Sequence, residues 1–149
     1  TIVVVFFADS FLTPFTAFLT TLGVVIAAWG GVMLADIALR RKDYDEPSLF
    51  TPSGRYGSVN WGAVASLIVG SLVGWGLVVN ASASWLSWQG YLLGPLGGRE
   101  GDWAGANIGI LLAMVVGFVG YWATSAGRVR AQEKLPSRTY AEGVEEGEQ

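Results

Sequence analysis

Few side chains in this 149-residue sequence could carry out acid–base, nucleophilic or metal chemistry. It contains no His and no Cys, so the commonest general base, the commonest transition-metal ligand and the thiolate nucleophile are all missing. Asp43, Asp45 and Glu46 form a short acidic run, which a solvated loop explains better than a metal site. There is no glycine-rich phosphate loop. The sequence therefore predicts a protein that is not an enzyme and has no cofactor or bound metal.

Asp36 is the one ionisable residue inside an apolar stretch, and such a residue is by default a candidate for function. It precedes Arg40 by four residues, so the two side chains can pair along a helix. Its helical phase places it away from the small residues described below. We favour a structural or interfacial role for Asp36, and ion coupling stays open as the alternative.

The stretch that contains Asp36 is residues 11–39, which is uncharged from Phe11 to Ala35 and is followed by a basic triplet at 40–42. About 25 uncharged residues extend over about 37 Å as a helix. The hydrocarbon core of a bilayer is only about 30 Å thick. The stretch therefore predicts a transmembrane helix that ends at the basic triplet.

The helical phase of this stretch separates small residues from bulky ones. One side is small or hydroxylic and the other is bulky and apolar. Because close helix packing favours small residues, the first side should face protein and the second lipid. The small side holds Thr13, Thr16, Thr20, Gly23, Ala27, Gly31 and Ala35, and the bulky side Phe11, Phe15, Phe18, Leu22, Trp29 and Met33.

Thr13, Thr16 and Thr20 occupy the small side in the first half of this helix. One interpretation is that they line a solute path and, with Pro14 as a flexible point, form an outer gate. The alternative is that threonine hydroxyls bond back to their own helix. Both interpretations stay open.

Two further uncharged runs predict transmembrane helices at residues 61–79 and 106–124. Gly70 and Gly74 form a small-residue ridge in the first, and Gly109 and Gly117 in the second, which favours helix packing. Residues 1–7 predict the end of a truncated span, joined to the next helix by a turn at 8–10. We therefore expect the chain to be the C-terminal fragment of a larger protein.

The basic residues predict how these helices are oriented. The loop at 40–60 contains four of the nine, the loop at 80–105 contains one, and the tail at 125–149 contains four. Because cytoplasmic segments are enriched in Lys and Arg, the first loop and the tail should be cytoplasmic and the 80–105 loop external. The external loop should hold an interfacial helix near 84–93, with Trp85, Trp88, Tyr91 and Trp103 at the membrane boundary. The tail should be disordered.

The composition supports an all-α integral membrane protein. Hydrophobic residues make up 52% and charged residues 14%, whereas soluble domains are about 25% charged. The expected partners are the lipid bilayer and other membrane helices, and the net charge of −3 does not suggest nucleic acid. Two other classes stay open: a small structural subunit of a membrane complex, and a membrane enzyme subunit that binds haem, quinone or metal.

The order of short motifs resembles the nucleobase–cation symporters, the family of purine–cytosine, allantoin and hydantoin permeases. The matching segments, in order, are Thr21-Leu22-Gly23, Gly31 to Asp36, Arg40-Arg41, Tyr44-Asp45, Leu49-Phe50, Gly54 to Gly57 and Val59-Asn60-Trp61. Each segment is weak alone, and their order carries the resemblance. Ile37 departs from it, because the family often has Tyr at this position.

The resemblance implies a leucine-transporter-type carrier with twelve helices, built on inverted repeats. This chain would hold the end of helix nine and helices ten to twelve, with helix ten as a moving outer gate. The implied function is import of a nucleobase or related heterocycle into the cell across the plasma membrane, coupled to Na⁺ or H⁺. The substrate and the coupling cation would bind on the missing N-terminal helices, outside this fragment.

Overall fold

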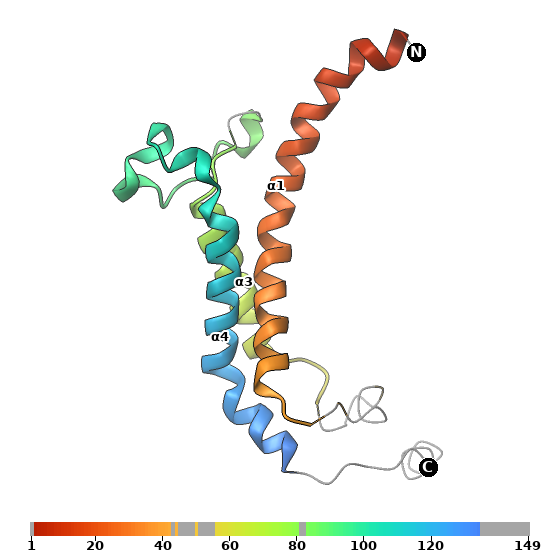
Figure 1. Cartoon of the computed structure of the whole chain (residues 1–149), viewed down its shortest axis with the longest axis vertical. Coiled ribbons are helices and arrows are strands. Elements are labelled where there is room, and N and C mark those ends of the chain that lie inside the picture. The colour runs from red at the N-terminus through yellow and green to blue at the C-terminus, as the bar shows by residue number, and fades with distance from the viewer. Residues whose placement is uncertain (1, 43, 45–49, 51–55, 81–82, 135–149) are drawn as a thin grey trace.

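The computed structural model describes residues 2–42, 44, 50, 56–80 and 83–134. Three α-helices make up most of it: α1 (Ile2–Leu39), α3 (Trp61–Gly76) and α4 (Ile108–Glu133). Between α3 and α4 lie four short 3-10 helices: η1 (Ser84–Leu86), η2 (Gly94–Leu96), η3 (Gly98–Glu100) and η4 (Ala104–Ala106). Helices α1 and α4 run in the same direction and α3 runs opposite to both, so the 3-10 helices lie at one end and the exit of α4 at the other (Figure 1).

Two of the helices are long and apolar enough to cross a membrane. They are Phe11–Leu39 within α1, with a mean hydropathy of 2.0, and Ile108–Glu133, with 1.8. Helix α3 is apolar but has only 16 residues. At about 1.5 Å per residue it is about 24 Å long, shorter than a hydrocarbon core of about 30 Å. The structure therefore holds two helices long enough to cross a membrane and one shorter apolar helix, where three complete spans were predicted.

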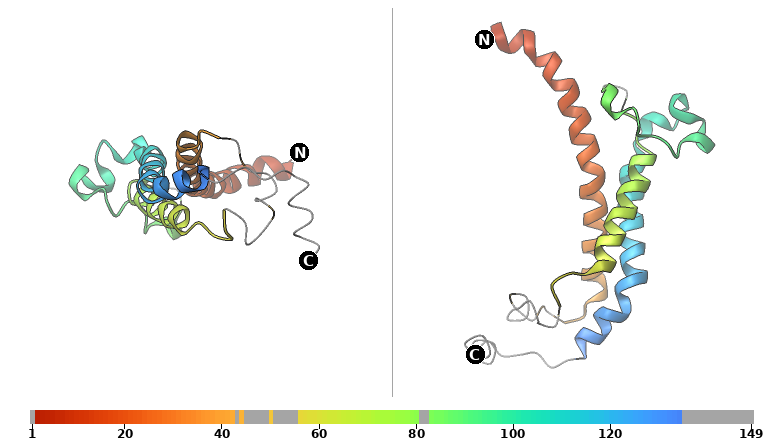
Figure 2. Two further views of the ribbon diagram at one scale, coloured as in Figure 1. Left: turned by 90° about the horizontal axis from the view of Figure 1, so that it is seen from below. Right: turned by 180° about the vertical axis from the view of Figure 1, so that it is seen from behind.

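Helix α1 is continuous from Ile2 to Leu39, so the turn predicted at residues 8–10 is not formed. These residues include neither Gly nor Pro, and a short polar sequence without either does not interrupt a helix. Pro14 lies inside the helix without ending it, although it removes one backbone hydrogen bond. Toward its N-terminus α1 leans away from α3 and α4 (Figures 1 and 2).

The side of α1 that packs on α3 and α4 differs from the predicted small-residue side in its first half. The buried residues are Ala17, Val24, Ala28, Gly31, Ala35 and Leu39. The predicted and observed sides share Gly31 and Ala35 and diverge toward the N-terminus. The space for Val24 is provided by its partner: a Cβ on Gly74 of α3 would lie 2.5 Å from Val24 Cγ1. The small residues of one helix therefore do not determine by themselves which side packs, because a glycine on the facing helix can accommodate a larger side chain.

Glycines allow the three helices to approach closely. A Cβ at Gly31 would overlap the backbone oxygen of Met114, one at Gly117 that of Ala28, and one at Gly109 that of Gly74. A Cβ at Gly70 would lie 2.9 Å from the carbonyl oxygen of Ala113. By contrast, Gly23 has nothing within 4 Å of its Cβ position, and Ala27 is only partly buried against the core. The predicted packing glycines thus lie at close helix contacts except for Gly23, and Ala27 lies at the margin of the contact.

Helix α3 is bounded by two capping arrangements. Asn60 Oδ1 accepts a hydrogen bond from the Ala63 amide at 3.3 Å, as an N-cap side chain does. At the other end the amides of Gly90 and Leu92 donate to the carbonyls of Trp75 and Gly76 at 2.9 and 2.8 Å. Because the following segment satisfies these carbonyls, the helix ends at Gly76, three residues before the predicted limit of 79.

The interfacial helix predicted near residues 84–93 is replaced by η1 and irregular turns. Gly90, Gly97 and Gly98 have φ angles of +80°, +94° and +74°, which a right-handed helix excludes. Pro95 adds a further break within η2. The segment therefore forms short turns, and the side chains of Trp85, Trp88, Tyr91 and Trp103 are exposed around them.

Helix α4 begins later and extends further than the predicted span at 106–124. Asn107 has a left-handed backbone, with φ of 49°, so the helix starts at Ile108. It continues to Glu133 because Val129 packs with Leu39 and Ala35 of α1. Residues 125–133, predicted to belong to a disordered tail, are therefore helical. Residues 135–149 of that tail lie outside the described residues.

Candidate functional site where the three helices meet

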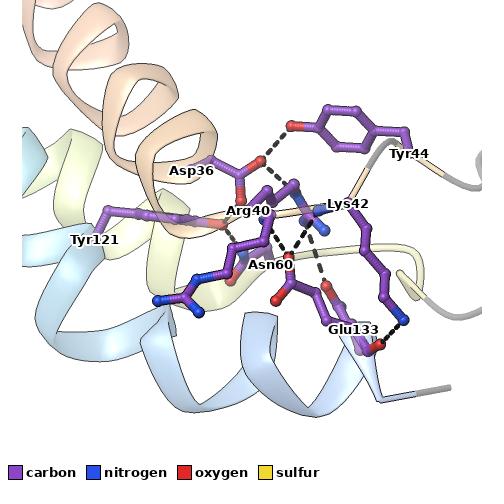
Figure 3. A network of polar contacts seen from close by, with 9 residues as sticks. Asp36, Arg40, Lys42, Tyr44, Asn60, Tyr121 and Glu133 are labelled. Carbon is purple, nitrogen blue, oxygen red and sulfur yellow. Dashed lines mark hydrogen bonds and ion pairs between the residues drawn. The ribbon is translucent and has the colours of Figure 1, made fainter.

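A cluster of polar side chains joins α1, α3 and α4 at the end where α1 finishes. Its centre is the carboxylate of Asp36, which receives three donors. Arg40 Nε donates to Oδ2 at 2.8 Å, the Tyr44 hydroxyl also donates to Oδ2, and the Tyr121 hydroxyl of α4 donates to Oδ1 (Figure 3). The Asp36 and Arg40 side chains are only 15% and 12% exposed. Asp36 is thus a neutralised carboxylate with its oxygens occupied.

The predicted pairing of Asp36 with Arg40 is confirmed. Asp36 was expected to lie away from the small residues of α1, and it is half-buried beside the buried Ala35. Its carboxylate still contacts α4, because the Tyr121 side chain is long enough to reach the edge of the contact between the two helices.

Arg40 is held by groups from three parts of the chain. Its guanidinium carbon lies 4.5 Å from the ring centre of Tyr44 and 5.2 Å from that of Tyr56, within the range of cation–π attraction. Its Nη2 donates to Gln132 Oε1 at 3.3 Å. Arg40 therefore links the end of α1 to the last turn of α4 and to the residues that precede α3.

Asn60 connects the start of α3 to the same cluster. Its Oδ1 caps α3, and its Nδ2 donates to the Tyr121 hydroxyl at 3.3 Å, which in turn donates to Asp36 (Figure 3). Arg128 of α4 donates from Nη2 to the carbonyl of Tyr56. We call Asp36, Arg40, Tyr44, Asn60 and Tyr121 the helix-end cluster. It surrounds a cavity of about 360 Å³.

The electrostatics of the helix-end cluster make it stable at physiological pH. Burial, and then the hydrogen bond to the Asp36 carboxylate, raise the pKa of Tyr44 above its ordinary value of 10.0. The hydroxyl therefore stays protonated and able to donate. Because the folded-state pKa is raised, the stabilisation is fully present below pH 10 and is lost only as the pH rises through the higher folded value.

The printed contacts of the cluster are ones that hold helices together. The Asp36 carboxylate is paired with a guanidinium and accepts hydrogen bonds from two hydroxyls. In the described part of the chain, no three His, Cys, Asp or Glu side chains gather as metal ligands would. The arrangement acts as a clamp that fixes the end of α1 to α3 and α4.

The predicted gate residues lie at the opposite half of α1. Thr13, Pro14 and Thr16 are exposed and Thr20 is half-buried, so they are not among the buried contacts with α3 and α4. The Thr20 hydroxyl donates to the carbonyl of Thr16 at 3.0 Å, which is the back-bonding considered as the alternative for these threonines. Whether this side of α1 lines a solute path stays a prediction.

A second set of contacts, which the sequence did not single out, holds the middle of α1, on the N-terminal side of the helix-end cluster. Trp75 Nε1 donates to the carbonyl of Thr21 at 2.9 Å, and Gln89 Nε2 donates to the Thr21 hydroxyl at 3.0 Å. Asn80 Nδ2 donates to the carbonyl of Ala17 at 2.9 Å. The sequence feature that could have indicated these contacts is the presence of two amide side chains, Asn80 and Gln89, in a mostly apolar region. These contacts mark Ala17 as the point beyond which α1 extends from the bundle.

Comparison with known protein families gives a match over most of the chain. The model of a family described as permeases for cytosine/purines, uracil, thiamine and allantoin matches residues 1–94. No curated protein and no solved structure is found to match the chain. The matched segment contains α1, α3 and all of the helix-end cluster except Tyr121.

Proposed function

Because this chain belongs to the family of permeases for cytosine/purines, uracil, thiamine and allantoin, we propose that it forms the C-terminal part of a secondary-active transporter. The transporter imports a nucleobase or related heterocycle and couples this to a cation, Na⁺ or H⁺. The family match over residues 1–94 is the observation that carries the proposal. The two long apolar helices agree with a protein that spans a membrane several times.

Within this function, α1 acts as the moving outer gate. Two features of its contacts support this role. Its last turns are fixed by the helix-end cluster and Asn80 holds its Ala17 carbonyl, while the N-terminal part of α1 leans away from α3 and α4 (Figure 2). The missing backbone donor at Pro14 lies just beyond the last contact point and lowers the cost of bending there. A helix fixed at one end and extended at the other can close over a site without unpacking its base.

The substrate and the coupling cation bind on other helices of the same carrier, in the inverted-repeat core that would precede this chain. The contacts of Asp36 support the placement of the cation site on other helices. Arg40 balances the charge of this carboxylate and two hydroxyls donate to it, so it is less available to Na⁺ or H⁺ than an unpaired carboxylate would be. The helix-end cluster therefore serves as the fixed base of the gate.

Orientation follows from the charges and the helix directions together. The segments at 40–60 and beyond 125 carry eight of the nine basic residues, and the ends of α1 and α4 that lead into them lie at one end of the bundle. We place that end in the cytoplasm of the cell and η1 to η4 outside the plasma membrane.

Uptake by the full-length protein tests this function. The gene is expressed in cells that lack their own nucleobase carriers, and uptake of labelled cytosine, uracil, hypoxanthine, allantoin and thiamine is measured. We expect at least one compound to accumulate above its external concentration, and accumulation to collapse with a protonophore or when Na⁺ is replaced by choline. Normal membrane levels with no uptake of any of these compounds would contradict the transport assignment. Uptake that only equilibrates would contradict cation coupling.

A further inference from the structure

A second cavity lies beside the helix-end cluster, between the ends of α1 and α4. Its volume is about 510 Å³, within the size range of ligand sites in proteins. Its lining includes four basic side chains, from Arg41, Lys42, Arg130 and Lys134, and one acidic side chain, from Glu133. The cavity therefore has an excess of positive charge. We call it the basic cavity.

The one acidic group of the basic cavity is already engaged. Glu133 Oε1 accepts hydrogen bonds from the backbone amides of Arg41 and Lys42, the latter at 3.2 Å, and Lys42 Nζ donates to the Glu133 carbonyl at 2.8 Å (Figure 3). Within the described residues, the side chains of Arg41, Arg130 and Lys134 form no ion pair. These three side chains are left to attract an anion.

The rest of the wall is apolar and belongs to the membrane-spanning helices. Ala38 and Leu39 are the last residues of α1, and Trp122, on α4, is 40% exposed. Tryptophan at the end of a span is typical of the boundary between lipid and water. A ligand of this cavity thus meets cations on the solvent side and an apolar surface on the membrane side.

We propose that the basic cavity binds an anionic phospholipid, with its phosphate among Arg41, Arg130 and Lys134 and its acyl chain along Leu39 and Trp122. Charge complementarity selects an anion, and the apolar wall selects a lipid over a soluble phosphate. Basic pockets between helices on the cytoplasmic side are suited to the anionic lipids of that leaflet. The lipid would link the ends of α1 and α4 from outside, next to the helix-end cluster that links them from within.

Native mass spectrometry of the full-length protein tests the proposal. The protein is titrated with phosphatidylglycerol and, separately, with phosphatidylcholine of identical acyl chains. The test variant is the double substitution Arg41→Gln/Arg130→Gln, which keeps the backbone amides that bind Glu133. The control on α4 is Arg128→Gln, which removes one positive charge at a residue that lines the other cavity. Thermal unfolding shows whether the variants are folded.

We expect the wild-type protein to bind phosphatidylglycerol more tightly than phosphatidylcholine. Each basic residue near an anionic lipid is worth about fivefold in affinity, so the double variant should bind phosphatidylglycerol about 25-fold more weakly. Its binding of phosphatidylcholine should not change, and Arg128→Gln should retain the preference.

Four results would overturn the lipid site. One is equal binding of the two lipids by the wild-type protein. Another is an equal loss in Arg128→Gln and the double variant. A third is binding of glycerol 3-phosphate as tight as that of the lipid, which would identify a soluble phosphate site. The fourth is phosphatidylglycerol binding that appears only after deletion of residues 142–149, since this would show that the chain's own acidic tail fills the cavity.

Discussion

Asp36 shows which contacts of a single residue can be predicted from sequence. Its pairing with Arg40 was predictable because two residues four apart on a helix are neighbours whatever the rest of the fold does. Its contacts with Tyr121 and Tyr44 were not, because they depend on the packing of α4 and on the path of the chain after α1. Asp36, for which ion coupling was the alternative, lies at the centre of a hydrogen-bonded cluster that joins three segments of the chain.

Replacing Asp36 should destabilise the protein. In Asp36→Ala the Arg40 guanidinium loses its one described ion pair and the Tyr121 hydroxyl loses its acceptor. A hydrogen bond to a charged group contributes about 1.5–3 kcal/mol, so the thermal unfolding midpoint of the purified full-length protein should fall. Asp102→Ala, at an exposed position among the 3-10 helices, is the control and should leave the midpoint unchanged. Equal midpoints for Asp36→Ala and the wild type would refute the clamp.

At the scale of elements, the sequence predicts which segments are helical. It predicts only in part which side of each helix packs against its neighbours. Long apolar runs identify α1 and α4, because a run of that length needs a helix to satisfy its backbone in lipid. The side of a helix that packs against a neighbour depends on the surfaces of both helices. Val24 is buried because Gly74 leaves room for it on α3, and nothing in the α1 sequence alone contains that information. The ends of α3 and α4 were missed for the same reason, since other segments decide them.

Gly31 offers a direct test of the close approach between α1 and α4. In Gly31→Ala the new methyl group would overlap the Met114 carbonyl, so the helices must separate and the unfolding midpoint should fall. Gly127→Ala is the matched control, because a Cβ there meets nothing within 4 Å. Alanine is favoured over glycine in a helix by about 1 kcal/mol, so this variant should be as stable as the wild type or more so. The opposite order of midpoints would show that α1 and α4 do not pack as described.

The outer half of α1 can be tested by transport. If Thr16 and Thr20 line the gate, Thr16→Trp or Thr20→Trp should reduce uptake strongly, because a bulky ring prevents closure. Phe15→Leu, on the bulky exposed side, should change uptake little. Initial rates of substrate uptake, normalised to protein in the membrane, give the comparison. Similar rates for all three variants would remove these threonines from the gate, leaving them as the back-bonded residues that the Thr20 hydrogen bond shows.

At the scale of the whole molecule, the helices alternate in direction as predicted. The errors in the predicted helix ends do not affect this alternation. Helices α1 and α4 run one way and α3 runs the other (Figure 1). The segment between α3 and α4 was predicted less well, because its glycines and Pro95 permit many turn conformations and hydrophobic periodicity does not choose among them. To decide which end of the bundle lies in the cytoplasm, the distribution of basic residues is needed as well as the helix directions.

Cysteine labelling can establish the sides, since this chain has no cysteine of its own. Single cysteines are introduced as Ser58→Cys, before α3, and Ser87→Cys, after η1, where both native side chains are exposed. Other cysteines of the full-length protein are first replaced. In intact cells a membrane-impermeant maleimide should label Ser87→Cys and not Ser58→Cys, and permeabilisation should make both reactive. The reverse pattern would invert the topology and place the basic cavity outside the cell. Labelling of both positions in intact cells would mean that α3, about 24 Å long, does not cross the bilayer.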